Sequence, residues 1–126
     1  MSEDVNKALA TDRVIDITTR GKSSGEPRRI EIWFHRVAGK IYLTGKPPRP
    51  RAWYANLVAN PHFTFHLKQS ATADLPATAR PITDPAERAA VFEGILAQLP
   101  QLPGEDAPVE AWLADSPLVE VSFDAA

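Results

Sequence analysis

The sequence predicts an α+β, mainly β fold: a small antiparallel barrel of six short strands, closed or half-closed, with peripheral helices. Three observations lead to this prediction. Short segments alternate apolar and polar residues, glycine and proline separate these segments, and the chain of 126 residues is 44% apolar. That length favours one core, so we expect residues 1–126 to form a single domain.

The first part of the chain contains three predicted strands. Residues 1–12 are expected to form a flexible polar arm or a short helix. A strand follows at Val14–Thr19, and Arg28–Val37 and Lys40–Thr44 form a hairpin around a tight turn. Trp33 lies on the polar face of the second strand, so a helix, a planar ring or a second subunit is expected to cover it.

A helix and two further strands are predicted in the middle of the chain. The helix spans Ala52–Ala59 and ends at Asn60-Pro61. Strict alternation over His62–Leu67 predicts the fourth strand. Residues 71–82 predict a fifth strand, which is expected to be bent or at an edge because Pro76 lacks a backbone donor.

The last part of the chain is predicted to contain a longer helix and a closing strand. Asp84 caps this helix, Pro85 suits its first turn, and Glu87 completes a capping box. The helix is expected to continue to about Leu99. After an acidic, loop-like stretch, Leu118–Phe123 closes the fold as a strand.

Composition excludes several classes of protein. The chain has no cysteine, so disulfides and thiolate ligands are absent. No apolar run reaches the length of a membrane span, and the acidic N-terminus lacks an apolar signal segment. A cytoplasmic location is therefore expected. An isoelectric point near 5.9 disfavours nucleic acid as a partner.

The three histidines predict no metal site. His62 and His66 share a strand face, but four residues along a strand separate them by roughly 13 Å, too far for one ion. His35, His62 and His66 are expected to be exposed strand residues. No serine–histidine–acid grouping stands out, and the catalytic residues are unknown at this level.

The charge is distributed unevenly along the chain. Residues 20–51 contain nine Lys and Arg and two acids, or 9 − 2 = +7, whereas the rest contains five cations and fourteen acids, or −9. Such asymmetry predicts a face for an anion; a solvated surface of mixed charge is the alternative.

Two turns within this window are candidate binding elements. The first lies between the first two strands and offers glycine, hydroxyl and cationic groups that suit phosphate or carboxylate; simple chain reversal is the alternative. The second is the proline-rich stretch Gly45–Arg51, which leads into the short helix, whose N-terminus favours anions. The alternatives to anion binding are a rigid connector, with Trp53 in the core, and a polyproline ligand for a partner domain. The candidate cofactor-binding residues are Lys22, Ser23, Ser24, Gly25, Pro27, Arg28, Thr44, Gly45, Lys46, Arg49, Arg51, Trp53 and Asn56.

Three stretches resemble one enzyme family. They are the turn Thr18–Arg28, the strand Gly39–Leu43 and the helix Trp53–Pro61, which reads Trp-Tyr-Ala-Asn-Leu-Val-Ala-Asn-Pro. Together they resemble the deazaflavin-dependent oxidoreductases of the nitroreductase type, which are split β-barrels related to flavin-binding pyridoxamine-phosphate oxidases. The match is close from about Ile17 to Leu67.

The resemblance implies a reductase that transfers a hydride between coenzyme F-420 and a small organic substrate. The phosphate and oligoglutamate tail of the coenzyme would lie near the turn of Lys22 and Arg28. FMN in the same barrel, or a non-catalytic cofactor- or lipid-binding module, remain alternatives. The family often has one more cation in this turn, and residues 100–117 lack the tyrosines of some nitro-reducing members. The reduction of nitro compounds by some family members is therefore not expected of this protein. Related barrels pair, so a homodimer is possible.

Overall fold

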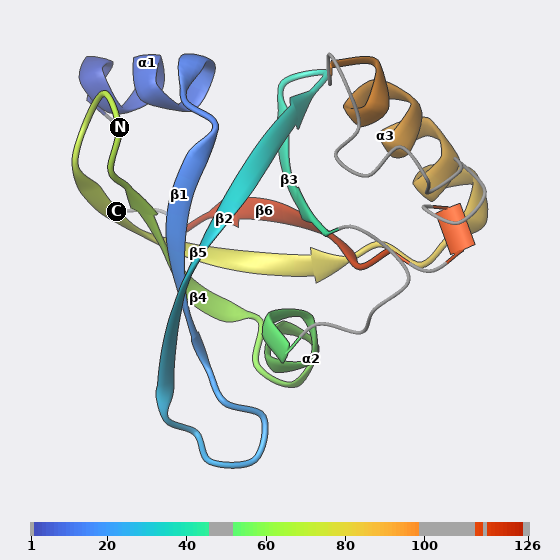
Figure 1. Ribbon diagram of the computed structural model, residues 1–126, viewed down its shortest axis with the longest axis horizontal. Coiled ribbons are helices and arrows are strands. Elements are labelled where there is room, and N and C mark those ends of the chain that lie inside the picture. Colours follow the sequence, from blue (N-terminus) through green and yellow to red (C-terminus); the bar gives the residue numbers. More distant parts are fainter. Residues whose placement is uncertain (1, 46–51, 99–112, 115, 125–126) are drawn as a thin grey trace.

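The computed structural model describes residues 2–45, 52–98, 113–114 and 116–124, and these form a closed antiparallel barrel with helices around it (Figure 1). The strand order around the barrel is β1-β2-β3-β6-β5-β4, and pairing of β1 with β4 closes it. The six predicted strands are confirmed. The elements are α1 (Glu3–Thr11), β1 (Val14–Arg20), β2 (Pro27–Val37), β3 (Lys40–Thr44), α2 (Ala52–Ala59), β4 (His62–Leu67), β5 (Ala73–Pro81), α3 (Pro85–Gln98) and β6 (Leu118–Phe123).

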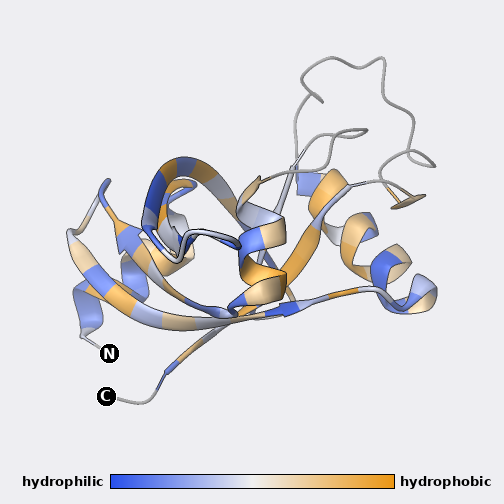
Figure 2. Cartoon of the chain, turned by 90° about the horizontal axis from the view of Figure 1, so that it is seen from below, coloured by the Kyte–Doolittle hydropathy of each residue, from blue (hydrophilic) through white to orange (hydrophobic). Residues whose placement is uncertain are grey.

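The barrel interior is a continuous apolar core. Apolar and polar residues alternate along the strands (Figure 2), so one face of each strand turns inward. Phe65 is fully buried and meets the rings of Phe34 and Phe123 edge to face, at centroid distances of 5.3 and 5.1 Å. Such pairs stabilise a core beyond the area that they bury.

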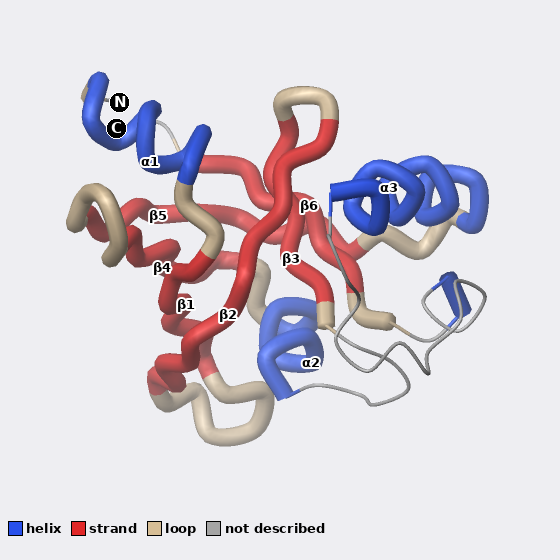
Figure 3. Tube along the Cα trace, turned by 45° about the horizontal axis from the view of Figure 1, so that its top comes forward, coloured by secondary structure: helices blue, strands red, loops and turns tan. Residues whose placement is uncertain are grey.

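The helix α3 covers a second, smaller core on the outside of the barrel. Val91, Phe92 and Ile95 of α3 are buried together with Tyr42 of β3 and Leu118 of β6. The predicted cap is confirmed, because the Glu87 amide donates to Asp84 Oδ2 at 2.9 Å. This packing fixes α3 against β2 and against Tyr42 of β3, away from α2 (Figure 3).

The close approach of α3 to β2 depends on Gly94. A Cβ atom at this position would lie 2.5 Å from Val37 Cγ1 and 3.0 Å from its Cγ2. Val37 is β-branched and turns aside only with strain. Gly94→Ala is therefore expected to lower the free energy of unfolding by about 1–2 kcal/mol, although alanine favours the helix by about 1 kcal/mol.

Urea denaturation of Gly94→Ala, alone and combined with Val37→Ala, measures this effect. Truncating Val37 removes the clash, so adding Gly94→Ala to that variant is expected to be neutral or stabilising. Equal losses from Gly94→Ala in both backgrounds would place the strain elsewhere.

Several sequence-based expectations need correction. His35 and His66 are buried rather than exposed, with only 8% and 7% of their surface accessible, whereas His62 is exposed as expected. Burial, with a contribution from Arg13, lowers the pKa of His35 to about 4. Trp33 is 49% exposed, so no described residue covers it fully.

Two further observations concern the helices. Residues 3–11 form a helix rather than a flexible arm, and the Val5 amide donates to the Ser2 hydroxyl that caps it. None of the described helices has the length and apolarity needed to cross a membrane.

Candidate cofactor-binding site

The β1–β2 hairpin extends beyond the barrel, and α2 lies beside it in both Figure 1 and Figure 3. Its turn is built by short local hydrogen bonds. The Gly21 amide donates to the Glu26 carbonyl at 2.8 Å, and the Gly25 amide donates to the Gly21 carbonyl at 2.9 Å. Gly25 has φ +71°, a conformation that costs other residues free energy. The turn is thus a defined structure rather than a loose connection.

A side chain of α2 holds this turn in place. Asn56 is buried; its Oδ1 accepts a hydrogen bond from the Lys22 amide at 2.8 Å, and its Nδ2 donates to Thr19 Oγ1 at 3.2 Å. Both ends of the amide are therefore used within the protein. Asn56 thus positions the turn, and it also lines the groove between the turn and α2.

A groove of about 490 Å³ lies between the turn and α2. We call it the turn–α2 groove. Its lining combines apolar residues of β2 and α2 with polar residues of the turn and with Arg28 of β2. It is lined by Thr19, Gly21, Lys22, Ser23, Ser24, Arg28, Ile30, Ala52, Trp53 and Asn56.

The lining of the groove carries positive charge that no described carboxylate compensates. Among the described residues, the side chains of Lys22 and Arg28 have no carboxylate or other hydrogen-bond partner. Ser24 Oγ accepts a hydrogen bond from the Glu26 amide at 3.1 Å, which leaves its own proton available. Two cations and two hydroxyls in the lining of one groove form a binding surface for an oxyanion.

The predicted candidates divide into three groups. Six of them line the groove, namely Lys22, Ser23, Ser24, Arg28, Trp53 and Asn56. Gly25, Pro27 and Gly45 are not among its lining residues, and buried Thr44 instead donates to the Pro117 carbonyl at 2.6 Å. Lys46, Arg49 and Arg51 lie outside the described residues.

Four groove residues are absent from the candidate list: Gly21, which lies in the predicted turn, and Thr19, Ile30 and Ala52. Strand alternation was the available signal for Thr19 and Ile30. Both lie on the inward faces of β1 and β2, and that face, which Arg28 shares, continues past the end of the barrel into the groove.

Loss of the Asn56 amide is expected to loosen the turn. Asn56→Leu leaves the Lys22 amide without its acceptor and Thr19 without its donor, so the free energy of unfolding is expected to fall by about 1–3 kcal/mol. Urea denaturation measures this change. Val58→Ala, at a 55% exposed position of the same helix, serves as control and should change stability by under about 0.5 kcal/mol. Equal effects of the two substitutions would contradict the role of Asn56.

The closed six-stranded antiparallel barrel with peripheral helices defines a fold class, the small α+β split β-barrels. Solved structures share the fold. An F420-H2 dependent reductase is 21% identical, with a TM-score of 0.63, over 88% of this chain and 95% of its own. A Listeria innocua protein provisionally described as a pyridoxamine 5′-phosphate oxidase is 15% identical, with a TM-score of 0.65, over 96% and 91% of the two chains. A third structure, described as a domain-swapped dimer, is 20% identical, with a TM-score of 0.62, over 88% and 81%.

Residues 2–105 match the model of the F420H(2)-dependent quinone reductase family, and the chain belongs to this family. It is therefore a deazaflavin-dependent oxidoreductase, and its cofactor is coenzyme F-420. The reductase and the cofactor predicted from the sequence are confirmed.

Proposed function

We propose that the turn–α2 groove binds coenzyme F-420 for the reduction of a small organic substrate. The observation that carries this proposal is that Lys22 and Arg28, whose side chains have no partner among the described residues, line the same groove as Trp53. A planar ring with an anionic extension needs both an apolar and a cationic surface. The residues present thus suit the cofactor in shape and in charge.

The apolar and the polar lining residues have separate tasks in this proposal. Ile30, Ala52 and Trp53 contact the ring and keep water from one of its faces. Lys22 and Arg28, with the serine hydroxyls between them, hold the phosphate and the nearby tail carboxylates. Gly25 and Asn56 position the turn, and they do so before the cofactor arrives.

When bound, the deazaflavin supplies hydride chemistry, because carbon replaces the nitrogen at the reacting position of a flavin. The protein's contribution is to bind, orient and shield it. The family description points to a quinone as acceptor. We propose a quinone-class substrate; reduction of a short-chain quinone by the reduced coenzyme tests this, and no turnover would contradict it.

Hydrogen–deuterium exchange locates the cofactor site without relying on turnover. Peptides covering residues 19–30 and 52–57 are expected to exchange more slowly when coenzyme F-420 is added, whereas α3 should be unaffected. Protection confined to other strands would contradict this location. Stronger protection by FMN than by the deazaflavin would favour the flavin alternative.

The remaining proposals concern the oligomeric state, the cellular location and nucleic-acid binding. We propose that residues 1–126 act as one domain and form a homodimer through the outer face that carries Trp33, since that ring is half exposed and one relative of the same fold is a domain-swapped dimer. Light scattering that shows only monomer at high concentration would contradict the dimer. A cytoplasmic location, favoured by the absence of cysteine, and no binding to nucleic acid, favoured by the low isoelectric point, complete the proposal.

A further inference from the structure

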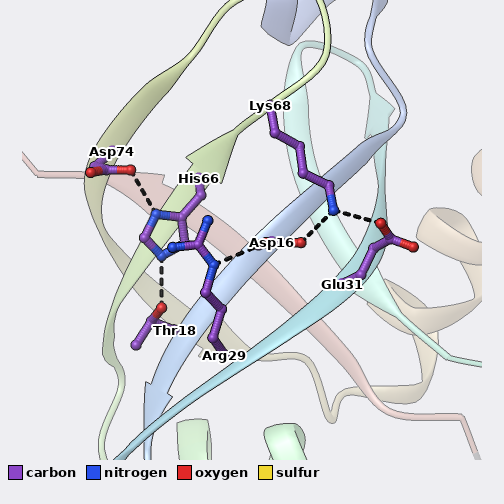
Figure 4. A network of polar contacts seen from close by, with 7 residues as sticks. All are labelled: Asp16, Thr18, Arg29, Glu31, His66, Lys68 and Asp74. Carbon is purple, nitrogen blue, oxygen red and sulfur yellow. Dashed lines mark hydrogen bonds and ion pairs between the residues drawn. The ribbon is translucent and has the colours of Figure 1, made fainter.

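A hydroxyl, an imidazole and a carboxylate form a chain across the outer face of the barrel. Thr18 Oγ1 of β1 lies 2.7 Å from His66 Nε2 of β4, and His66 Nδ1 lies 2.7 Å from Asp74 Oδ1 of β5 (Figure 4). The three strands are neighbours in the barrel, so the register of the sheet fixes this alignment. The His66 side chain is only 9% exposed.

The carboxylate determines which nitrogen of His66 carries the proton. The hydrogen bond from His66 lowers the pKa of Asp74, which keeps this carboxylate ionised and able only to accept. In neutral His66 the proton therefore lies on Nδ1, and Nε2 accepts the hydrogen bond from the Thr18 hydroxyl. This is the order of groups that activates a hydroxyl nucleophile: nucleophile, base and orienting acid.

The other charges on this face do not compete for His66. Lys68 Nζ contacts Asp16 and Glu31, and Arg29 Nε donates to Asp16 Oδ2 at 2.9 Å. These ion pairs lie beside the chain of three groups in Figure 4. Asp16 is thus engaged by cations, and Asp74 is the carboxylate that orients the imidazole.

A second groove, which we call the outer groove, gives access to Thr18. It has a volume of about 290 Å³, and Arg20, Phe63, Thr64 and Pro76 also line it. It is separate from the turn–α2 groove, because Thr18 faces outward from β1 whereas its neighbour Thr19 faces inward. The Arg20 Nη1 donates to the Gly25 carbonyl at 3.3 Å, which leaves other guanidinium donors for a developing oxyanion.

The same face contains a natural comparison with the same residue types. Thr78 Oγ1 donates to Asp124 Oδ1 at 2.7 Å and lies 3.3 Å from His62 Nδ1. The proton of this hydroxyl is directed at a carboxylate, so the imidazole of His62 cannot accept it. Thr78 therefore lacks the activation that the geometry gives Thr18.

We propose that Thr18 is a nucleophile that takes acyl groups from small carboxylic esters bound in the outer groove. His66 acts as the general base, and Asp74 positions His66. Thr18 Oγ1 forms a bond to the ester carbonyl carbon while its proton passes to His66 Nε2. The bond to the leaving alkoxide breaks, and the alkoxide takes that proton. Water then attacks the acyl-threonine in the same way, which releases the carboxylic acid and restores the hydroxyl.

Covalent labelling of the intact protein tests this proposal at both threonines at once. A fluorophosphonate probe traps an activated hydroxyl as fluoride leaves, and peptide mass spectrometry identifies the labelled residue. Thr18 is expected to react about 100-fold or more faster than Thr78 in the same molecule, the range that a general base provides. Thr18→Ser should retain labelling, and Thr18→Val and His66→Gln should lose it. Hydrolysis of 4-nitrophenyl acetate should likewise be retained in Thr18→Ser and lost in Thr18→Val and His66→Gln.

A spectroscopic measurement tests the arrangement independently of reactivity. Long-range proton–nitrogen NMR correlation of His66 is expected to report the Nδ1-protonated tautomer in the wild type, and Asp74→Asn should reduce that preference. The Nε2-protonated tautomer, or equal labelling of Thr18 and Thr78, would overturn the proposal. Labelling that persists in folded Thr18→Val would overturn it as well.

Discussion

Arg88→Met is expected to lower the free energy of unfolding by about 3–5 kcal/mol, more than any other substitution proposed for this protein. The Arg88 side chain donates three hydrogen bonds: Nε to the Leu113 carbonyl at 2.9 Å, Nη1 to the Ile82 carbonyl at 2.9 Å, and Nη2 to the Ser116 carbonyl at 2.7 Å. Hydrogen bonds from charged donors each contribute about 1.5–3 kcal/mol, and the loss of several leaves buried acceptors unpaired. The side chain also lies 5.3 Å from the Phe92 ring centroid.

Arg80→Met provides a matched control for this substitution. Arg80 also contacts two carboxylates, Glu87 at 2.6 Å and Glu120 at 2.7 Å, but its side chain is 52% exposed. Water screens such pairs, so the expected loss is about 0–1 kcal/mol. Chemical denaturation of both variants measures the difference. Comparable losses from Arg80 and Arg88 would show that the three carbonyl contacts add nothing to stability.

The second large effect concerns the cofactor. Arg28→Ala is expected to weaken binding of coenzyme F-420 by about 1.5–3 kcal/mol, the contribution of a hydrogen bond that involves a charge. Arg28 lines the turn–α2 groove and has no partner among the described residues, so its charge is available to a ligand. A fluorescence titration with the oxidised coenzyme measures the change.

The neighbouring arginine supplies the control for this binding experiment. Arg29 carries the same charge, but it faces the outside of the barrel and pairs with Asp16. Arg29→Ala is therefore expected to leave the affinity within about twofold of the wild type, since screening weakens the effect of a distant charge. If both alanine variants bind the coenzyme with unchanged affinity, Arg28 is not part of the site.

Local sequence signals were sufficient to predict the elements of this fold. Alternation predicted β4 at its observed ends, and the capping residues predicted the start of α3. Pro76 shows where such reasoning stops. It was expected to bend β5 or place it at an edge, but β5 lies between β4 and β6. The proline is tolerated because pairing with β6 begins one residue later, at Ala77.

Tertiary contacts account for what the sequence could not predict. Alternation assigns His66 to the outward face, but only the register of three strands brings Thr18 and Asp74 against it and buries it. The same limit applies to Asn56, whose partner Lys22 is distant in sequence and meets it only when α2 packs beside the hairpin. Charge and glycine content nevertheless identified the turn, because that signal is local.

The most direct test of the account compares two ligands on the unmodified protein: the complete coenzyme and the deazaflavin chromophore without its phosphate and glutamate tail. If Lys22 and Arg28 hold the anionic part, the complete coenzyme should bind at least about tenfold more tightly, as expected for a charged contact. Rising salt should reduce this advantage. Equal affinity for the two ligands at low salt would contradict the cationic groove as the cofactor site.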